Sequence, residues 1–175
     1  MKTLVVLAFA VAFGAGVLLF PNALEPGKAE RDGIALELLR PGTDRLASED
    51  WYLGSGAVRV SRVTAGAKVV MDPRTRIALT SRSLAVLPRE CYRLSFTGRS
   101  SGSRVHVLVT DEDLRIILSS VPVPRNDAAR RASTTFTPGD RRRISLLVRA
   151  RGAATTLIGG LRLDRIPAGD CSRAS

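Results

Sequence analysis

The sequence predicts an all-β protein, built as an antiparallel two-sheet sandwich and preceded by a single N-terminal hydrophobic helix. Three observations support this prediction. Apolar and polar residues alternate with a period of two beyond Gly33, Pro and Gly turn signals separate the alternating stretches, and an uncharged apolar run lies at the N-terminus. About 140 residues are enough to bury the core of such a sandwich.

The N-terminal segment has the pattern of an export signal. Met1 and Lys2 precede the uncharged run Thr3–Phe20, which is close to the roughly 20 residues that span a bilayer and longer than the core of about 7–15 residues usual in cleaved signals. We therefore expect residues 1–20 to form a signal-anchor, with a cleaved signal peptide as the alternative. Lys2 places the N-terminus in the cytoplasm and the rest of the chain outside it. Residues 21–32 contain Pro, Gly and mixed charges and are typical of a linker.

Residues 33–175 form the predicted sandwich domain. The clearest alternation places Val105, Val107 and Val109 on one side of a strand, with His106 on the other. Pro41–Gly42, Asp72–Pro73 and similar pairs mark the turns. The predicted strands are Ile34–Leu39, Val58–Val63, Lys68–Met71, Arg76–Thr80, Ser83–Leu87, Tyr92–Phe96, Val105–Val109, Leu114–Ser119, Ser133–Phe136, Ile144–Ala150 and Leu157–Arg165.

Composition limits the classes of function. Hydrophobic residues make up 45% of the chain and charged residues 25%, which excludes a disordered, collagen-like or coiled-coil protein. The net charge is +11, and nearly all basic residues are arginine. Nucleic acid would fit this charge, but the export segment and an aromatic content of only 5% argue against it.

The arginines are the most distinctive candidates for binding. In several strands they alternate with apolar residues, so they would form one basic outer face if those strands shared a sheet. A guanidinium group suits carboxylate and phosphate ligands, although the same residues could simply be a solvated surface. The candidate ligand-binding residues are Arg93, Arg104, His106, Arg141, Arg143, Arg149 and Arg162.

The order of several motifs resembles a known family. Trp51 comes early, Val86–Pro88 leads into Tyr92–Phe96, and Phe136–Asp140 precedes a long strand. Over about Leu36 to Ile166 this progression is similar to the jelly-roll sandwiches of the galactose-binding and carbohydrate-binding-module type. The resemblance implies a non-catalytic domain that binds glycans at a concave sheet face or at loop tips.

The resemblance also bears on cofactors and rings. Such domains often hold a structural calcium through an acidic residue early in the last strand, but Gly159–Gly160 occupy the matching place here. We therefore expect no metal or other cofactor, with a structural calcium as the alternative. Sugar platforms need exposed rings, yet Trp51 is expected to seal the core and Tyr92 is in phase with core residues.

The two cysteines are placed by the same resemblance. Cys91 opens the Tyr92–Phe96 strand and Cys171 follows the last strand. If those strands are antiparallel neighbours, as the resemblance suggests, the two sulfur atoms meet and form a disulfide in an exported protein. Two free thiols in a reducing compartment are the alternative.

No residue pattern indicates an enzyme. His106 is the single histidine, and no G-x-S-x-G motif accompanies it. Asp111–Asp113 lacks the spacing of a calcium loop and is typical of a hairpin turn. Two cysteines and one histidine without C-x-x-C spacing exclude an ordinary zinc site.

These observations predict a single-pass cell-membrane protein with an extracytoplasmic binding or accessory module. Its expected target is a cell-envelope glycan or another anionic envelope component. The alternative is a structural interaction subunit that docks a membrane complex without binding sugar.

Overall fold

The computed structural model describes residues 33–39, 46–47, 50–54, 56–64 and 66–171. The predicted N-terminal helix and linker lie outside these residues, so the structure does not test them. Within the described part of the chain, no helix has the length and apolar character needed to cross a membrane.

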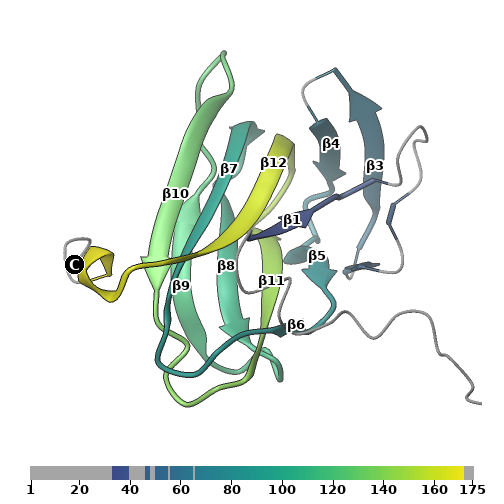
Figure 1. Cartoon of the computed structure of the whole chain (residues 1–175). Helices are drawn as coiled ribbons and strands as arrows, with labels where there is room; N and C mark the ends of the chain where they lie inside the picture. The colour runs from purple at the N-terminus through teal and green to yellow at the C-terminus, as the bar shows by residue number, and fades with distance from the viewer. Residues whose placement is uncertain (1–32, 40–45, 48–49, 55, 65, 172–175) are drawn as a thin grey trace, which may run out of the picture.

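Two antiparallel sheets form a sandwich (Figure 1). The first sheet has the strand order β10-β7-β12-β4-β3, with β1 beside β12, and the second has the order β2-β5-β11-β8-β9, with β6 beside β11. The all-β two-sheet prediction is confirmed, and one short 3-10 helix, η1 (Ala168–Asp170), follows the last strand. The strands are β1 (Ile34–Leu36), β2 (Trp51–Leu53), β3 (Val58–Val63), β4 (Gly66–Met71), β5 (Ile77–Ser81), β6 (Leu84–Ala85), β7 (Cys91–Gly102), β8 (Val105–Asp111), β9 (Ile117–Pro122), β10 (Arg130–Phe136), β11 (Arg143–Ala150) and β12 (Ala154–Ile166).

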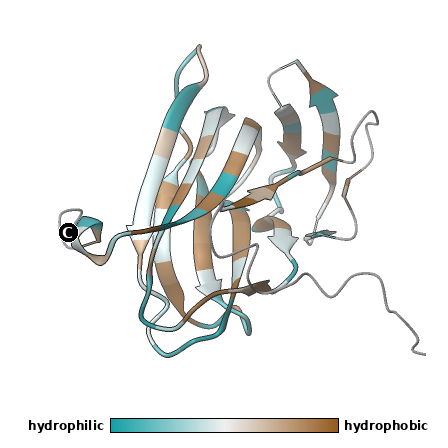
Figure 2. Cartoon of the chain, viewed as in Figure 1, coloured by the Kyte–Doolittle hydropathy of each residue, from teal (hydrophilic) through white to brown (hydrophobic). Residues whose placement is uncertain are grey.

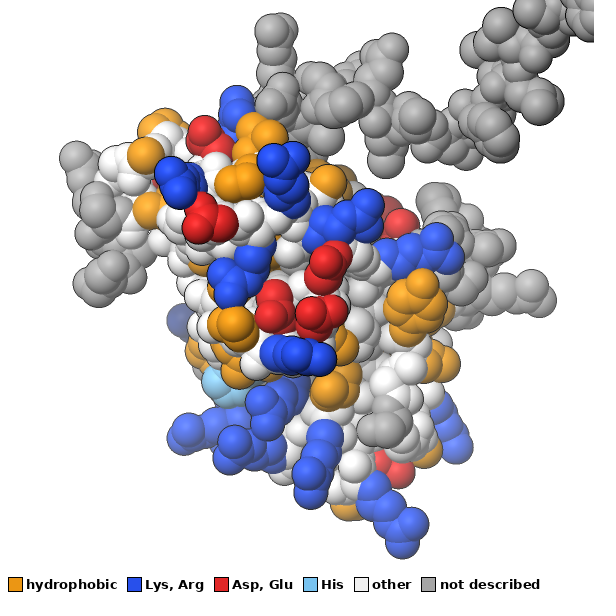
Figure 3. Space-filling model, turned by 90° about the horizontal axis from the view of Figure 1, so that it is seen from below, with side chains coloured by type: hydrophobic (Ala, Val, Ile, Leu, Met, Phe, Trp, Pro, Cys, Tyr) orange, Lys and Arg blue, Asp and Glu red, His pale blue; other side chains and the backbone are white. Residues whose placement is uncertain are grey.

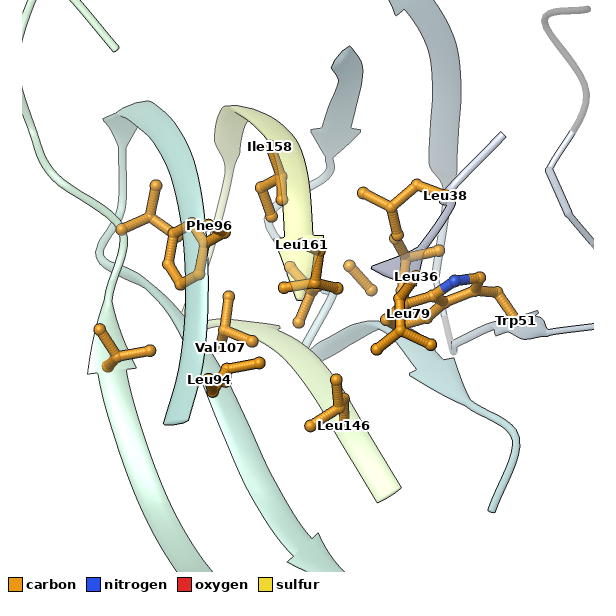
Figure 4. Close-up of a cluster of buried hydrophobic side chains, with 14 of the residues drawn as sticks. Leu36, Leu38, Trp51, Leu79, Leu94, Phe96, Val107, Leu146, Ile158 and Leu161 are labelled. Carbon is orange, nitrogen blue, oxygen red and sulfur yellow. The ribbon is translucent and has the colours of Figure 1, made fainter. Parts of the chain in front are cut away.

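The core lies between the sheets, as the alternation predicts. Leu94 and Phe96 of β7 face Val107 of β8 and Leu146 of β11 across it (Figure 4). Each of these four side chains is at most 1% exposed. Apolar bands recur along the strands in Figure 2 for the same reason. Burial of each large apolar side chain stabilises the sandwich by about 1.5–3 kcal/mol.

Two aromatic residues lie in the core, as predicted. Trp51 is 1% exposed and packs at the end of the sandwich near Leu36 and Leu79 (Figure 4). Tyr92 stacks on Phe136 with ring centroids 5.9 Å apart, and its hydroxyl accepts a hydrogen bond of 2.8 Å from the N–H of Leu87. Neither Trp51 nor Tyr92 is a sugar platform.

The predicted disulfide is present. β7 and β12 are antiparallel neighbours, and their register places Ile166 opposite Cys91. The chain then turns through η1 and brings Cys171 to Cys91, with their Cα atoms 5.9 Å apart. The bond ties the C-terminal end of the sandwich to the start of β7.

The predicted strand Leu114–Ser119 is wrong at its start. The chain turns after Asp111, whose Oδ1 accepts hydrogen bonds from the N–H groups of Arg115 (2.7 Å) and Ile116 (3.0 Å). Leu114 adopts a positive φ of 61°, which a strand cannot contain. β9 therefore begins at Ile117.

Two shorter strands also differ from the prediction. The expected strand Ser83–Leu87 is reduced to the two residues of β6, and β2 (Trp51–Leu53) had no predicted counterpart. β2 pairs with β5 and forms an edge of the second sheet, whereas β6 pairs with the first two residues of β11. Such short strands are held by pairing rather than by a long alternating pattern.

Candidate binding face on the second sheet

The predicted ligand residues do not form one face. Arg93 and Arg162 lie on β7 and β12 of the first sheet, whereas Arg143 and Arg149 lie on β11 of the second. The condition for a common basic face, that these strands share one sheet, is therefore not met. Strand alternation fixes which side a residue takes but not which sheet its strand joins. Their role in ligand binding stays a prediction.

His106 and the two arginines in turns complete the predicted set. His106 lies on β8 of the second sheet, directly opposite Arg149 in the pairing with β11. Arg104 lies just before β8, in the turn that follows β7. Arg141 precedes β11 and donates a hydrogen bond of 3.3 Å to the carbonyl of Pro138.

The first-sheet candidates already contact carboxylates. Arg162 forms an ion pair of 3.2 Å with Asp164, and Arg93 lies 3.8 Å from Asp170. All four side chains are partly exposed, so these pairs add little stability. They do, however, reduce the positive charge that the outer face of the first sheet offers to an anion.

The outer face of the second sheet has an apolar floor. Leu147 of β11 pairs with Leu108 of β8 and with Thr80 of β5. Leu147 and Leu108 lie on the side opposite the core, yet they are only 3% and 5% exposed. Neighbouring side chains on this face must therefore shield them from water, which gives the middle of the face an apolar base.

A depression of about 390 Å³ lies beside this floor. Two exposed apolar side chains contribute to its lining, Tyr52 (53% exposed) and Leu114 (42% exposed). The guanidinium carbon of Arg82 lies 5.8 Å from the centroid of the Tyr52 ring, within cation–π range. The lining residues are Tyr52, Thr80, Ser81, Arg82, Ser83, Glu112, Leu114, Arg143 and Ser145.

Strand alternation and turn geometry place these side chains. Because Trp51 points into the core, the next residue, Tyr52, must point outward. Hydrogen bonds from Ile116 and Arg115 hold the pKa of Asp111 below its usual value, so its carboxylate remains ionised and organises the turn. That turn carries Leu114 to the depression. The arrangement combines apolar walls, hydroxyl groups and two arginines against one carboxylate, Glu112.

His106 lies in basic surroundings on the same outer face. Its Nδ1 is 3.1 Å from Ser120 Oγ. Burial, and then the charges of Arg104, Arg149 and Arg151, lower the pKa of the imidazole. Figure 3 shows basic side chains beside the histidine, with acidic side chains gathered nearer the centre of the view.

The structure offers no metal-ligating cluster within its described residues. No group of three or more His, Cys, Asp or Glu side chains lies there in an arrangement that could hold a metal ion. Gly160, at the irregularity in the β12 pairing, has a φ of 59°, a conformation that suits glycine. Gly160 thus allows the backbone to bend at this irregularity in β12.

Sequence reasoning missed Tyr52 and Arg82. A ring next to a buried Trp51 in an extended segment has to face the opposite way, so Tyr52 could have been found from the alternation alone. Arg82 could not, because its contact with the Tyr52 ring depends on β2 pairing with β5, which brings together residues 30 positions apart.

Comparisons with known proteins give the fold. No family model and no curated protein matches the chain. Solved structures do. The N-terminal cellulose-binding domain of Cellulomonas fimi β-1,4-glucanase C is 14% identical with a TM-score of 0.55, over 78% of this chain and 97% of that domain. The CBM22-1 xylan-binding domain of Paenibacillus barcinonensis Xyn10C is 13% identical with a TM-score of 0.53, over 78% and 96%.

A CBM4 structure is also similar, at 16% identity and a TM-score of 0.52, over 67% of this chain and 96% of that one. The protein therefore has the jelly-roll fold of the carbohydrate-binding modules, as the resemblance implied. At these identities the comparison establishes the fold and leaves the ligand to be argued from the site.

Proposed function

We propose that the protein is a non-catalytic, extracytoplasmic glycan-binding module and that the depression at Tyr52 binds an acidic cell-envelope glycan. The exposed Tyr52 ring is the observation that carries the proposal. It offers a flat apolar surface on which the apolar face of a sugar can stack, and it lies in a depression of suitable size for a sugar unit. Structural neighbours that bind cellulose and xylan support a glycan as the ligand.

The charge of the depression favours an acidic sugar. Its lining contains two arginines, Arg82 and Arg143, and one carboxylate, that of Glu112. Arg143 forms no ion pair with any described residue, so two of its guanidinium N–H bonds can donate side by side to a carboxylate. Uronic acids present such a carboxylate on each sugar ring.

A non-catalytic role fits the chemistry of the face. His106 contacts Ser120 rather than a carboxylate, so no described group orients it as the base of a hydrolytic triad. The disulfide supports an extracytoplasmic location, since such bonds persist in oxidising compartments. In this proposal the N-terminal apolar run tethers the domain to the cell membrane.

Calorimetry on the full-length chain in a non-ionic detergent tests the proposal. We expect binding to oligogalacturonate, weaker binding to the neutral cello- and xylo-oligosaccharides, and no release of new reducing ends from any of them. Absence of binding to the whole panel contradicts a glycan-binding function. Release of reducing ends contradicts the non-catalytic role.

A second function is favoured by one observation. Three large apolar side chains are exposed in and just after the β8–β9 turn: Leu114 (42%), Ile116 (47%) and Ile117 (53%). Such a cluster suits contact with another protein. A membrane protein that co-purifies with the wild type but not with an Ile116→Ser, Ile117→Ser variant, together with no glycan binding, supports a docking subunit instead.

A further inference from the structure

Three arginines and the single histidine are placed at the end of the second sheet away from Arg143, near enough for the arginines to act on the charge of the imidazole. Arg149 is opposite His106, and the next pair, Ala150 and Val105, closes the β11–β8 ladder. Arg104 immediately precedes that ladder and Arg151 immediately follows it. The two flanking arginines therefore leave the same end of the sheet, beside the Arg149–His106 pair.

We propose that this end of the face is a second, separate site, which binds a doubly charged oxyanion such as a phosphate or sulfate group through Arg104, Arg149 and Arg151 around His106. Arg143 and Arg149 are six residues apart on one strand, which corresponds to roughly 20 Å. The oxyanion site is thus distinct from the depression and does not depend on glycan binding there.

No carboxylate among the described residues forms an ion pair with these arginines. None of the three takes part in the ion pairs of the described chain, which involve Arg89, Arg93 and Arg162. The strands on either side contribute no acid: β9 places Pro122 opposite His106, and β5 places Ile77 opposite Arg149. Like charges on neighbouring side chains repel one another, and a bound dianion relieves that repulsion.

The imidazole adds a directional donor. His106 Nδ1 lies 3.1 Å from Ser120 Oγ, so when Nδ1 accepts the hydroxyl proton of Ser120, Nε2 carries the ring proton. Burial and the three arginines lower the imidazole pKa, which keeps the ring neutral at neutral pH. A bound dianion adds negative charge beside it, so oxyanion binding raises the His106 pKa and promotes proton uptake.

The single histidine makes this site directly observable. Only one imidazole is present in the chain, so its NMR signal needs no assignment by mutation. The full-length chain in a non-ionic detergent is titrated with acid in sodium chloride and again in sodium sulfate at equal ionic strength. Sulfate is used because it stays doubly charged throughout the titration. We expect the apparent pKa of His106 to be higher in sulfate.

Two variants with the same loss of charge show whether the response to sulfate depends on Arg149 or on the overall positive charge of the protein. Arg149→Gln should abolish most of the sulfate-dependent rise, whereas Arg59→Gln removes the same charge from the first sheet and should leave it intact. Equal pKa values in chloride and sulfate for the wild type overturn the proposal. An undiminished rise in the Arg149→Gln variant overturns it as well.

The same measurement of the His106 pKa with other compounds identifies the source of the oxyanion. Inorganic phosphate represents a free ion. Dextran sulfate represents sulfate esters carried on a glycan, and uncharged dextran is its control. A response to dextran sulfate at lower concentration than to sulfate assigns the site to a substituted glycan. Equal responses assign it to the free ion. Oligogalacturonate binding at the depression is measured in a separate experiment. Either proposal, glycan binding at the depression or oxyanion binding at His106, can therefore be contradicted without the other.

Discussion

The outer faces of the two sheets are both basic, yet among the described residues the features of a glycan-binding site are found on the second sheet. On the first sheet, Arg162 and Arg93 contact carboxylates and the nearby rings of Tyr92 and Phe136 point into the core. On the second sheet, Tyr52 is exposed over a depression, and Arg143 forms no ion pair with a described residue. Positive charge alone therefore does not mark a glycan-binding site. A hollow, an exposed ring and an arginine without an ion-pair partner together favour one.

The largest expected effect is the loss of stability on removal of the disulfide, without a change in glycan affinity. Replacing both cysteines, Cys91→Ala with Cys171→Ala, frees a loop of 80 residues and should cost about 4 kcal/mol of unfolding free energy. The disulfide belongs to the first sheet, so oligogalacturonate affinity of the folded variant should not change. Chemical denaturation measures the first quantity and calorimetry the second. Loss of affinity in the folded double variant would show that the two sheets are coupled.

Charge removal on each face compares the two sheets directly. Arg143→Gln deletes a charge-assisted contact to a sugar carboxylate and should weaken oligogalacturonate binding by about 2 kcal/mol, roughly thirty-fold. Arg131→Gln makes the same change of charge on exposed β10 of the first sheet and should leave affinity unchanged. Calorimetry checks both variants. Equal losses would mean that overall charge, rather than the second sheet, attracts the ligand.

Removal of the Tyr52 ring tests whether the second sheet offers a stacking surface to a sugar. Tyr52→Ala should reduce glycan affinity by about 1 kcal/mol, roughly five-fold, because the stacking surface is lost. Stability should hardly change, since Tyr52 is 53% exposed. Leu53→Ala is the control, because Leu53 is similarly exposed (55%) but does not line the depression. A Tyr52→Ala variant with wild-type affinity contradicts the stacking role.

The smallest expected effect is a loosening of the β8–β9 turn when acid protonates the Asp111 carboxylate. The folded pKa of Asp111 lies below its usual value of 3.8, so its contribution to stability is present above pH 3.8 and is lost as the pH falls through the folded pKa. Amide exchange at Arg115 and Ile116 should quicken in that range. In Asp111→Asn, which does not titrate, exchange at these amides should lack that pH step. The same step in both proteins would assign it to another group.

Much of the fold is predictable because alternation and turns are local signals. The strands around Leu94, Val107 and Leu146, the buried Trp51 and the Cys91–Cys171 bond all follow from the sequence and its resemblance. The start of β9 does not, because the apolar Leu114 adopts a turn conformation that its side chain would not suggest.

The candidate site is less predictable than the fold. Arg143, Arg149 and His106 were identified by alternation, but the sheet that contains them is decided by long-range pairing. The same pairing brings Arg82 to Tyr52 and shields Leu147 on the outer face. A site built across strands distant in sequence becomes visible only when the register is known.

We propose that the glycan binds to the second sheet, and a chemical-shift map of the full-length chain tests this location. Oligogalacturonate is added to ¹⁵N-labelled protein and backbone amide signals are followed. The account predicts shifts at Thr80, Arg82 and Ser145, with little change at Thr97 and Arg131 on the first sheet. Shifts confined to the first sheet, or none at saturating ligand, would contradict it.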